Sequence, residues 1–306
     1  MKLKKLIKEI QSPGQLFMKI IYHYPNLLKW IDDEKYLRIC YRITIGKKLN
    51  LKDPKLFTEK LQWLKLYDRK DIYTTMVDKY EAKKYVEKSI GVKYIIPTLG
   101  VWDNFDDINF DKLPNKFVLK CTHDSGGLVI CKDKNNFDIV SARKKINRSL
   151  KKNFYWVGRE WPYKNVKPKI IAEQYMEESN NSDLKDYKFY CFNGKVKLFL
   201  IIQDRRGNAT GDYFDENNNY VKINNGFPNA NSIPKLPDNI EEMKKLAEKL
   251  SKGIAELRVD FYNINGKIYF GELTFFDGSG FEKFKPEKYN QLLGEWIDLS
   301  IVKRNY

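Results

Sequence analysis

The segment from Arg258 to Thr274 constrains the fold more than any other part of this 306-residue chain, because it predicts a β-hairpin. Asn265-Gly266 lies between two strand-like runs, and this dipeptide is a strong signal for a tight turn between antiparallel strands. Asp260 and Glu272 fall on opposite arms, and Arg258 precedes Asp260 by two residues. Carboxylates beside a guanidinium suit a magnesium–triphosphate site, because hard cations share phosphate oxygens with protein oxygens.

The length of the turn decides whether the two acids share one face of the hairpin, since strand side chains alternate between faces. A two-residue loop would pair 264 with 267, place 260 opposite 271 and send Glu272 to the other face. We therefore predict a three-residue loop, residues 264–266, with pairs 263–267, 258–272 and 260–270. Gly266 would then adopt the left-handed conformation of a bulge. The alternative to a metal site is ordinary surface polarity.

The remaining pattern predicts an α+β chain. Hydrophobic residues make up 42% of the sequence, which is typical of a folded globular protein. Residues 1–90 are predicted to be mainly helical, with helices at 56–67 and 75–88. Further helices are predicted at 137–152 and 240–256, strands at 115–120, 128–131, 170–176 and 187–202, and a loop at 217–237.

The charge of the chain bears on which partners it binds, and its cysteine content bears on its cellular compartment. The formal net charge is +16, and residues 1–60 hold 14 Lys and Arg against 6 Asp and Glu, or +8. Residues 1–10 place leucines and isoleucines on one helical face and lysines elsewhere, which predicts contact with an anionic membrane surface. An ordinary surface helix has the same pattern. We find no membrane-spanning run, no signal peptide and no CxxC pair, so we expect a cytoplasmic protein, peripheral at the inner membrane face.

Lys120 ends a strand-like run just before the loop Ser125-Gly126-Gly127. A lysine on a strand beneath a glycine-rich loop can place its ammonium on nucleotide phosphates, while the glycines let backbone N–H groups approach. A lysine at a strand end is more often a solvated surface residue. The loop is not a Walker A motif, because Gly-Lys-Ser/Thr is absent.

Two later segments could complete a nucleotide site. The run Glu173 to Met176 suits a hinge that pairs with adenine, although an edge strand would have the same pattern. Asp186 and Lys188 lie on one face of the next predicted strand, where they could hold a ribose hydroxyl and a phosphate. The alternative for this pair is a surface ion pair.

In this order, the parts resemble an ATP-grasp enzyme, and most closely the TupA-like ATP-grasp family of bacterial surface-polysaccharide loci. The resemblance runs from about residue 35 to the C-terminus. The segments that carry it are Phe57 to Asp68, Phe117 to Gly126, Phe214-Asp215 and Phe270 to Phe275.

The resemblance implies two antiparallel-sheet lobes that clasp ATP with Mg²⁺. The expected divisions are a helical N-terminal region (1–75), a small lobe with the glycine-rich loop (76–172) and a C-terminal lobe with the metal hairpin (173–306). Catalytic roles are implied for Arg258 and Lys188. The implied ATP contacts are Lys79, Lys120, Ser125, Gly126, Gly127, Glu173, Gln174, Tyr175, Met176 and Asp186. The implied metal ligands are Asp260, Glu272 and Thr274, the last where many relatives carry Asn.

The implied reaction is that of a carboxylate–amine ligase. ATP phosphorylates a carboxylate to an acylphosphate, and an amine attacks it to form an amide. The expected substrates are a uronic acid of a capsular or cell-surface polysaccharide, or its precursor, and an amino acid or amine. Our candidates for holding the acid are Arg205, Arg206, Gly278, Ser279 and Gly280.

Three other classes remain as alternatives. A glycosyltransferase of polysaccharide biosynthesis would commonly show Asp-x-Asp, and a kinase would show His-Arg-Asp and Asp-Phe-Gly; the sequence has none of these. A non-catalytic basic protein that binds glycan or membrane would explain the charge but not the acidic hairpin. We expect no nucleic-acid partner.

Overall fold

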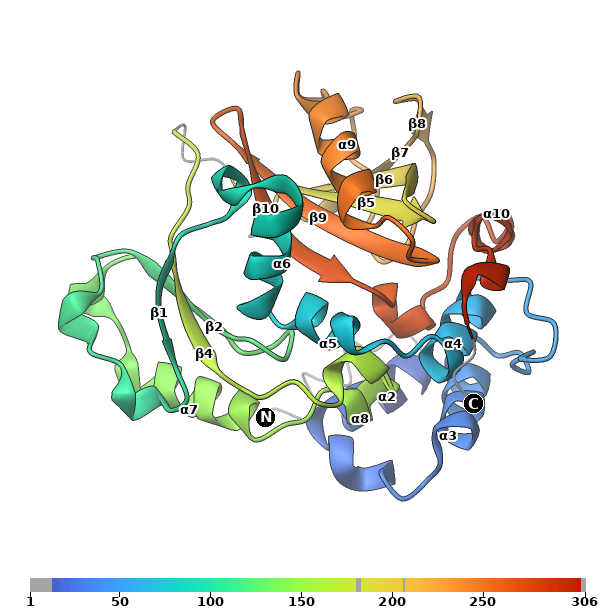
Figure 1. Cartoon of the computed structure of the whole chain (residues 1–306), viewed down its shortest axis with the longest axis horizontal. Coiled ribbons are helices and arrows are strands. Elements are labelled where there is room, and N and C mark those ends of the chain that lie inside the picture. The colour runs from blue at the N-terminus through green and yellow to red at the C-terminus, as the bar shows by residue number, and fades with distance from the viewer. Residues whose placement is uncertain (1–12, 180–182, 206, 304–306) are drawn as a thin grey trace.

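The computed structural model describes residues 13–179, 183–205 and 207–303, which form two antiparallel sheets with helices around them (Figure 1). This confirms the predicted α+β class. The smaller sheet has the order β1-β4-β2-β3 and the larger one β10-β9-β5-β6-β7-β8. The small-sheet strands are β1 (Thr98–Trp102), β2 (Phe117–Cys121), β3 (Leu128–Cys131) and β4 (Ile170–Gln174). The large-sheet strands are β5 (Asp186–Phe192), β6 (Lys195–Gln203), β7 (Thr210–Asp215), β8 (Tyr220–Val221), β9 (Glu256–Ile264) and β10 (Lys267–Thr274).

Helices form much of the chain before the first strand. The α-helices of the described chain are α2 (Pro13–His23), α3 (Asp33–Thr44), α4 (Phe57–Tyr67), α5 (Asp71–Val77), α6 (Glu81–Ile90), α7 (Ile139–Leu150), α8 (Tyr155–Gly158), α9 (Ile240–Leu250) and α10 (Lys288–Trp296). The helix α4 agrees with the prediction. It begins at Phe57 because the Glu59 carboxylate accepts hydrogen bonds from the free N–H groups of Lys55 and Leu56, at 3.0 and 3.1 Å.

Each sheet has its own hydrophobic core. The small sheet packs on α7 through Phe117, Leu119 and Ile146, all fully buried. The larger core joins the N-terminal helices to the six-stranded sheet, so that Leu61 and Phe189 belong to the same cluster. The helical region is therefore packed as part of the larger lobe. The four-stranded sheet draws its strands from residues 98–174, while the division into three units stays a prediction.

The predicted helix at 75–88 is wrong, because the chain breaks between α5 and α6. The Asp78 carboxylate accepts hydrogen bonds from the N–H groups of Tyr80 and Glu81 at 2.8 and 3.0 Å, which starts a new helix there. The N–H of Lys79 turns away to the carbonyl of Thr122, at 3.0 Å. This long-range bond ties α6 to the loop after β2.

Other boundaries also differ. The helix predicted at 240–256 ends at Leu250, and the chain turns through Gly253, at φ +75°, before β9 begins. The predicted strand run at 187–202 is divided into β5 and β6 by a turn at Asn193-Gly194, where both residues have positive φ. The predicted loop at 217–237 holds the short strand β8.

The predicted three-residue hairpin loop is wrong. Ile264 pairs with Lys267, so the turn is the two residues Asn265 and Gly266, at φ +51° and +76°, as a type I′ turn requires. The register then shifts between Phe270 and Glu272, and Glu272 lies opposite Asp260. Gly271 is thus the extra residue of a β-bulge, which returns Glu272 to the face of Asp260.

Candidate functional site

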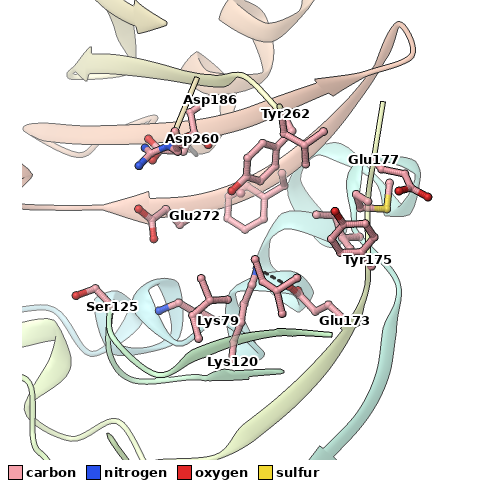
Figure 2. A pocket seen from close by; sticks show the side chains of 18 of the residues that line it. Lys79, Lys120, Ser125, Glu173, Tyr175, Glu177, Asp186, Asp260, Tyr262 and Glu272 are labelled. Carbon is pink, nitrogen blue, oxygen red and sulfur yellow. Dashed lines mark hydrogen bonds and ion pairs between the residues drawn. The ribbon is translucent and has the colours of Figure 1, made fainter. Parts of the chain in front are cut away.

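A cavity of about 770 Å³ lies between the two sheets. Figure 2 shows Lys79, Lys120 and Glu173 on one side of it and Asp186, Asp260 and Glu272 on the other. Of the predicted ATP and metal contacts, most line this cavity. They are Lys79, Lys120, Ser125, Gly127, Glu173, Tyr175, Met176, Asp186, Asp260 and Glu272, together with Lys188.

Glu173 holds two lysines on the small-sheet side. One carboxylate oxygen lies 2.5 Å from Nζ of Lys83 and the other 2.5 Å from Nζ of Lys120 (Figure 2 shows the second lysine). Burial would raise the pKa of Glu173, but the two lysines together lower it. Lys83 was not predicted from the sequence; it lies on α6, four residues after Lys79 of the turn that precedes this helix.

The glycine-rich loop is held from within. The Asp124 carboxylate accepts a hydrogen bond from the N–H of Gly127 at 2.9 Å, and Nζ of Lys79 donates to the Asp124 carbonyl oxygen. Gly126 does not line the cavity, because it faces the N-terminal helices: a Cβ there would lie 2.1 Å from the hydroxyl of Tyr22. Its small size is thus explained by packing.

The segment predicted to form the adenine hinge lies only partly at the cavity. Glu173, Tyr175 and Met176 line the cavity, whereas the Gln174 side chain is exposed and does not. The Gln174 N–H donates to the Pro97 carbonyl oxygen at 3.0 Å. Apolar walls suited to a flat ring lie on both sides. They are Ile95, Ile96, Leu128 and Ile130 from the small lobe, and Tyr262 and Phe270 from the hairpin.

Arg258 joins the polar groups of the hairpin. Its Nε and Nη2 donate to the two oxygens of Asp260 at 2.7 and 2.8 Å. The same Nη2 lies 3.1 Å from Glu272 Oε1 and 3.1 Å from Thr274 Oγ1. Nη1 donates to Asp277, a residue that the sequence analysis did not single out. The residues that were required to share one face therefore do so.

The negative charge of Asp260 is balanced by two basic side chains. It pairs with Lys188 on the neighbouring strand as well as with Arg258. Burial would raise the pKa of Asp260, but Arg258 and Lys188 lower it to about 2. The side chain of Glu272 is 44% exposed, so it has room to accept another partner.

The donor set fits a magnesium ion shared with a nucleotide. Asp260 and Glu272 supply hard oxygen ligands side by side, and Thr274 Oγ1 lies 3.4 Å from Glu272 Oε1. Over the described ranges, no group of three or more His, Cys, Asp and Glu side chains is placed to hold a metal ion. Mg²⁺ characteristically takes one or two carboxylates and completes its shell with phosphate and water oxygens.

The residues predicted to hold the acid lie in two places. Arg205 lines the cavity and pairs with Asp186. Arg206 lies outside the described residues. The three residues 278–280 belong to the short helix η7 (Asp277–Gly280), which contacts Gln62 and Lys65 of α4 and does not line the cavity. Where the acid binds therefore stays a prediction.

The sequence model of the TupA-like ATPgrasp family matches residues 59–298. The chain belongs to this family. The resemblance that the motifs indicated is thereby confirmed, and the two antiparallel sheets are those of an ATP-grasp fold. No curated protein sequence matches the chain.

Several solved structures are similar to this ATP-grasp protein. One is D-alanine–D-alanine ligase from Bacillus anthracis complexed with ATP, at 18% identity and a TM-score of 0.40 over 66% of this chain and 55% of that one. Another is the same enzyme from Helicobacter pylori, at 18% identity and a TM-score of 0.42, over 79% of this chain and 69% of that one. A third is the ATP-grasp ligase PsnB complexed with a minimal precursor, Mg and ADP, at 11% identity and a TM-score of 0.40, over 78% of this chain and 66% of that one. The chain thus spans 55% of the first of these structures.

Proposed function

We propose that this protein is an ATP-dependent carboxylate–amine ligase that forms an amide through an acylphosphate. The observation that carries the proposal is the network of Arg258 with Asp260 and Glu272 at one end of a cavity whose other wall holds Lys79, Lys83 and Lys120. Cations at one wall and a metal-type acid pair at the other suit a bound triphosphate.

In this proposal ATP lies between the two sheets. The ring fits between the apolar residues of the small lobe and Phe270 of the hairpin, and Asp186 takes a ribose hydroxyl. The phosphates contact Lys79, Lys83 and Lys120, and the γ-phosphate contacts Arg258 and Lys188. A magnesium ion on Asp260 and Glu272, with Thr274 nearby, would neutralise phosphate charge and orient the γ-phosphate.

The residues act by positioning and by charge. The substrate carboxylate attacks the γ-phosphorus, and the bond from phosphorus to the bridging oxygen breaks with its electron pair leaving on ADP. Arg258 and Lys188 offset the negative charge that spreads over the transferred group. The amine then attacks the acyl carbon, and phosphate departs. The protein supplies no nucleophile in this scheme.

We propose further that the acid is a uronic acid of a capsular or cell-surface polysaccharide or of its precursor, and that the partner is an amino acid or another amine. Support comes from the family resemblance and from the net charge of +16, which favours acidic substrates.

We also propose a cytoplasmic protein that touches the inner membrane face through residues 1–10, a segment outside the described residues. Among the described residues, every helix is too short or too polar to span a bilayer.

The test is turnover with ATP, Mg²⁺ and paired sets of uronic acids and amines. ADP release that requires both the acid and the amine, with an amide identified by mass spectrometry, supports the ligase. Phosphate found on a stable acceptor would indicate a kinase instead. UDP released from a UDP-sugar would indicate a glycosyltransferase, and either result would overturn the proposal.

A further inference from the structure

A cluster of buried polar side chains lies next to the nucleotide cavity and has no role in the scheme above. It joins Gln62 and Lys65 of α4, Glu160 of the segment after α8, and Ser279 of η7. Lys65 is fully buried, Glu160 is 6% exposed, and Ser279 is half-buried. Charged groups are seldom removed from water without a specific function or partner.

The Lys65 ammonium fixes the orientation of the Ser279 hydroxyl. Nζ donates to Gln62 Oε1 at 3.0 Å, to the Ser279 carbonyl oxygen at 2.7 Å and to Ser279 Oγ at 3.0 Å. These bonds use its three N–H groups. The rings of Phe281 and Phe276 lie 4.6 and 5.7 Å from Nζ and favour the charged form. Since Ser279 Oγ accepts from Lys65, its own proton points to another acceptor.

The acceptor that the geometry offers is the carboxylate of Glu160. A Cβ built on Gly158 would lie 2.0 Å from Ser279 Oγ and 3.0 Å from Glu160 Oε1, so the hydroxyl and the carboxylate face the same small space. Burial raises the pKa of Glu160, with Asp277 acting the same way and Lys65 in the opposite direction. Burial lowers the pKa of Lys65 to about 8.

The backbone holds Ser279 in an unusual conformation. Gly278, Ser279 and Gly280 have φ of +53°, +55° and +66°, a region that a residue with a Cβ rarely adopts. The Gln62 amide donates to the carbonyl oxygens of Ser279 and Gly280 at 3.2 and 3.0 Å, so α4 keeps the turn in this form. The turn thus holds the Ser279 hydroxyl against the buried ammonium of Lys65.

The turn that carries this hydroxyl is connected to the hairpin network at the end of the cavity. Asp277, two residues earlier, accepts hydrogen bonds from Arg258 and from the Tyr190 hydroxyl, the second at 2.6 Å. Tyr163, which follows Glu160 by three residues, has its pKa raised by burial and by Glu160 and Glu272. The turn that carries Ser279 is therefore tied, through Asp277, to the arginine that holds Asp260 and Glu272.

We propose that Ser279 and Glu160 are catalytic residues that take a proton from the ammonium group of the acceptor substrate, with Lys65 and Gln62 as positioning residues. This rests on the proposed ligase function and assigns the amine to this turn. The ammonium proton passes to Ser279 Oγ while the hydroxyl proton moves to Glu160. The neutral amine attacks the acyl carbon, a C–N bond forms, and the C–O bond breaks with its electron pair on phosphate. The departing phosphate takes the second N–H proton.

The experiment compares two nucleophiles in Ser279→Ala and Glu160→Gln. Hydroxylamine is uncharged near neutral pH and needs no deprotonation before attack. With the uronic acid and ATP, we expect both variants to form hydroxamate within about threefold of wild type. Amide formation with the amine substrate should fall about 100-fold or more, the range of general acid–base catalysis. The exposed Glu295→Gln is the matched control and should change neither product.

The outcomes separate this inference from the proposed function. Equal loss of hydroxamate and amide in variants that still melt like wild type would overturn the inference, because the cluster would then serve the fold or the acid step. Unchanged amide formation in both variants would also overturn it. If wild-type protein forms neither product from any acid, the proposed function itself fails. Raising the pH should partly restore amide formation in Glu160→Gln, since more amine is then neutral; a merely structural role would give no such recovery.

Discussion

Glu272 is the residue at which the metal assignment can be tested with least damage to the fold. Its side chain is 44% exposed and lies at the edge of the Arg258 network. We expect Glu272→Gln to lower turnover by about two to three orders of magnitude, as the removal of one group stabilising the transition-state charge does. The melting temperature should stay close to that of wild type. Steady-state ADP release over a range of Mg²⁺ concentrations measures the effect.

The control for this variant is Glu87→Gln on the exposed face of α6. It removes the same charge from a residue that does not line the cavity and should leave turnover unchanged. Full activity in Glu272→Gln at low Mg²⁺ would contradict the assignment of this residue as a ligand.

Asp260 gives a prediction about pH. Its pKa in the folded protein is about 2, below the value of about 3.9 usual for an aspartate in an unfolded chain. Its contribution to stability is therefore present above pH 4 and is lost as the pH falls through 2. We expect Asp260→Asn to lower the free energy of unfolding by about 3 to 5 kcal/mol at pH 7, as breaking a buried pair does.

Urea unfolding of wild type and Asp260→Asn between pH 7 and pH 2.5, without added metal, measures this difference. The gap between the two proteins should narrow as the pH falls below 4. A gap of constant size would show that the charge of Asp260 does not stabilise the fold.

Sequence reasoning found single residues where their types occur in a known order, and missed those defined by packing. Lys120, Asp260 and Glu272 were named from motif and spacing, and all three line the cavity. Lys65 and Glu160 were passed over because a lysine or glutamate in a helix or loop usually lies in water. Their burial depends on η7, more than a hundred residues away from either, and no local pattern records such a contact.

The loop length of the hairpin could not be predicted from the sequence pattern alone. The acids had to share a face, and either an odd-length loop or a bulge satisfies that condition. The signal for the bulge was available, since Gly271 interrupts a strand and glycine there often marks an extra residue. Periodicity alone could not decide between the two, because both give the same alternation for Asp260 and Glu272.

Two glycine substitutions separate the bulge from the turn. A Cβ at Gly271 would lie 3.1 Å from the Asp260 carbonyl oxygen and 3.3 Å from Tyr262 Cε2, so Gly271→Val should displace the arm that carries Glu272. We expect turnover to fall at least about tenfold, since small displacements in a catalytic site are costly. Gly266→Ala, at φ +76° with open space around it, should cost about 1 to 2 kcal/mol of stability and leave turnover unchanged.

Turnover and urea unfolding of both glycine variants provide the comparison. Loss of turnover in Gly266→Ala together with normal turnover in Gly271→Val would show that the turn, and not the bulge, sets the position of the acids.

At the scale of the molecule, the surface near the N-terminus bears on membrane contact. The side chains of Tyr24, Leu27 and Trp30 are 67%, 57% and 79% exposed, in and beside the short helix η1 (Pro25–Leu28). Apolar and aromatic groups exposed together with basic residues are typical of surfaces that enter the interface of an anionic bilayer. In the sequence, these residues follow the segment predicted to contact lipid.

We expect the protein to sediment with vesicles that contain anionic lipid and to be released by salt. Deleting residues 1–10 should lower the bound fraction, and Trp30→Ala should lower it further. Vesicles of zwitterionic lipid alone are the control. Equal sedimentation of wild type and the deletion variant would remove residues 1–10 as the point of contact.

The contact between Tyr22 and Gly126 can couple the nucleotide cavity to the N-terminal surface. Helix α2 meets the glycine-rich loop there, with no room for even a methyl group between them. If that loop shifts when a nucleotide enters, α2 must shift with it or part from it, and either event changes the free energy of the N-terminal surface. By thermodynamic reciprocity, whatever that surface binds then alters nucleotide affinity by the same factor. Nucleotide binding in the cavity would then be detectable as a change in binding at the N-terminal surface.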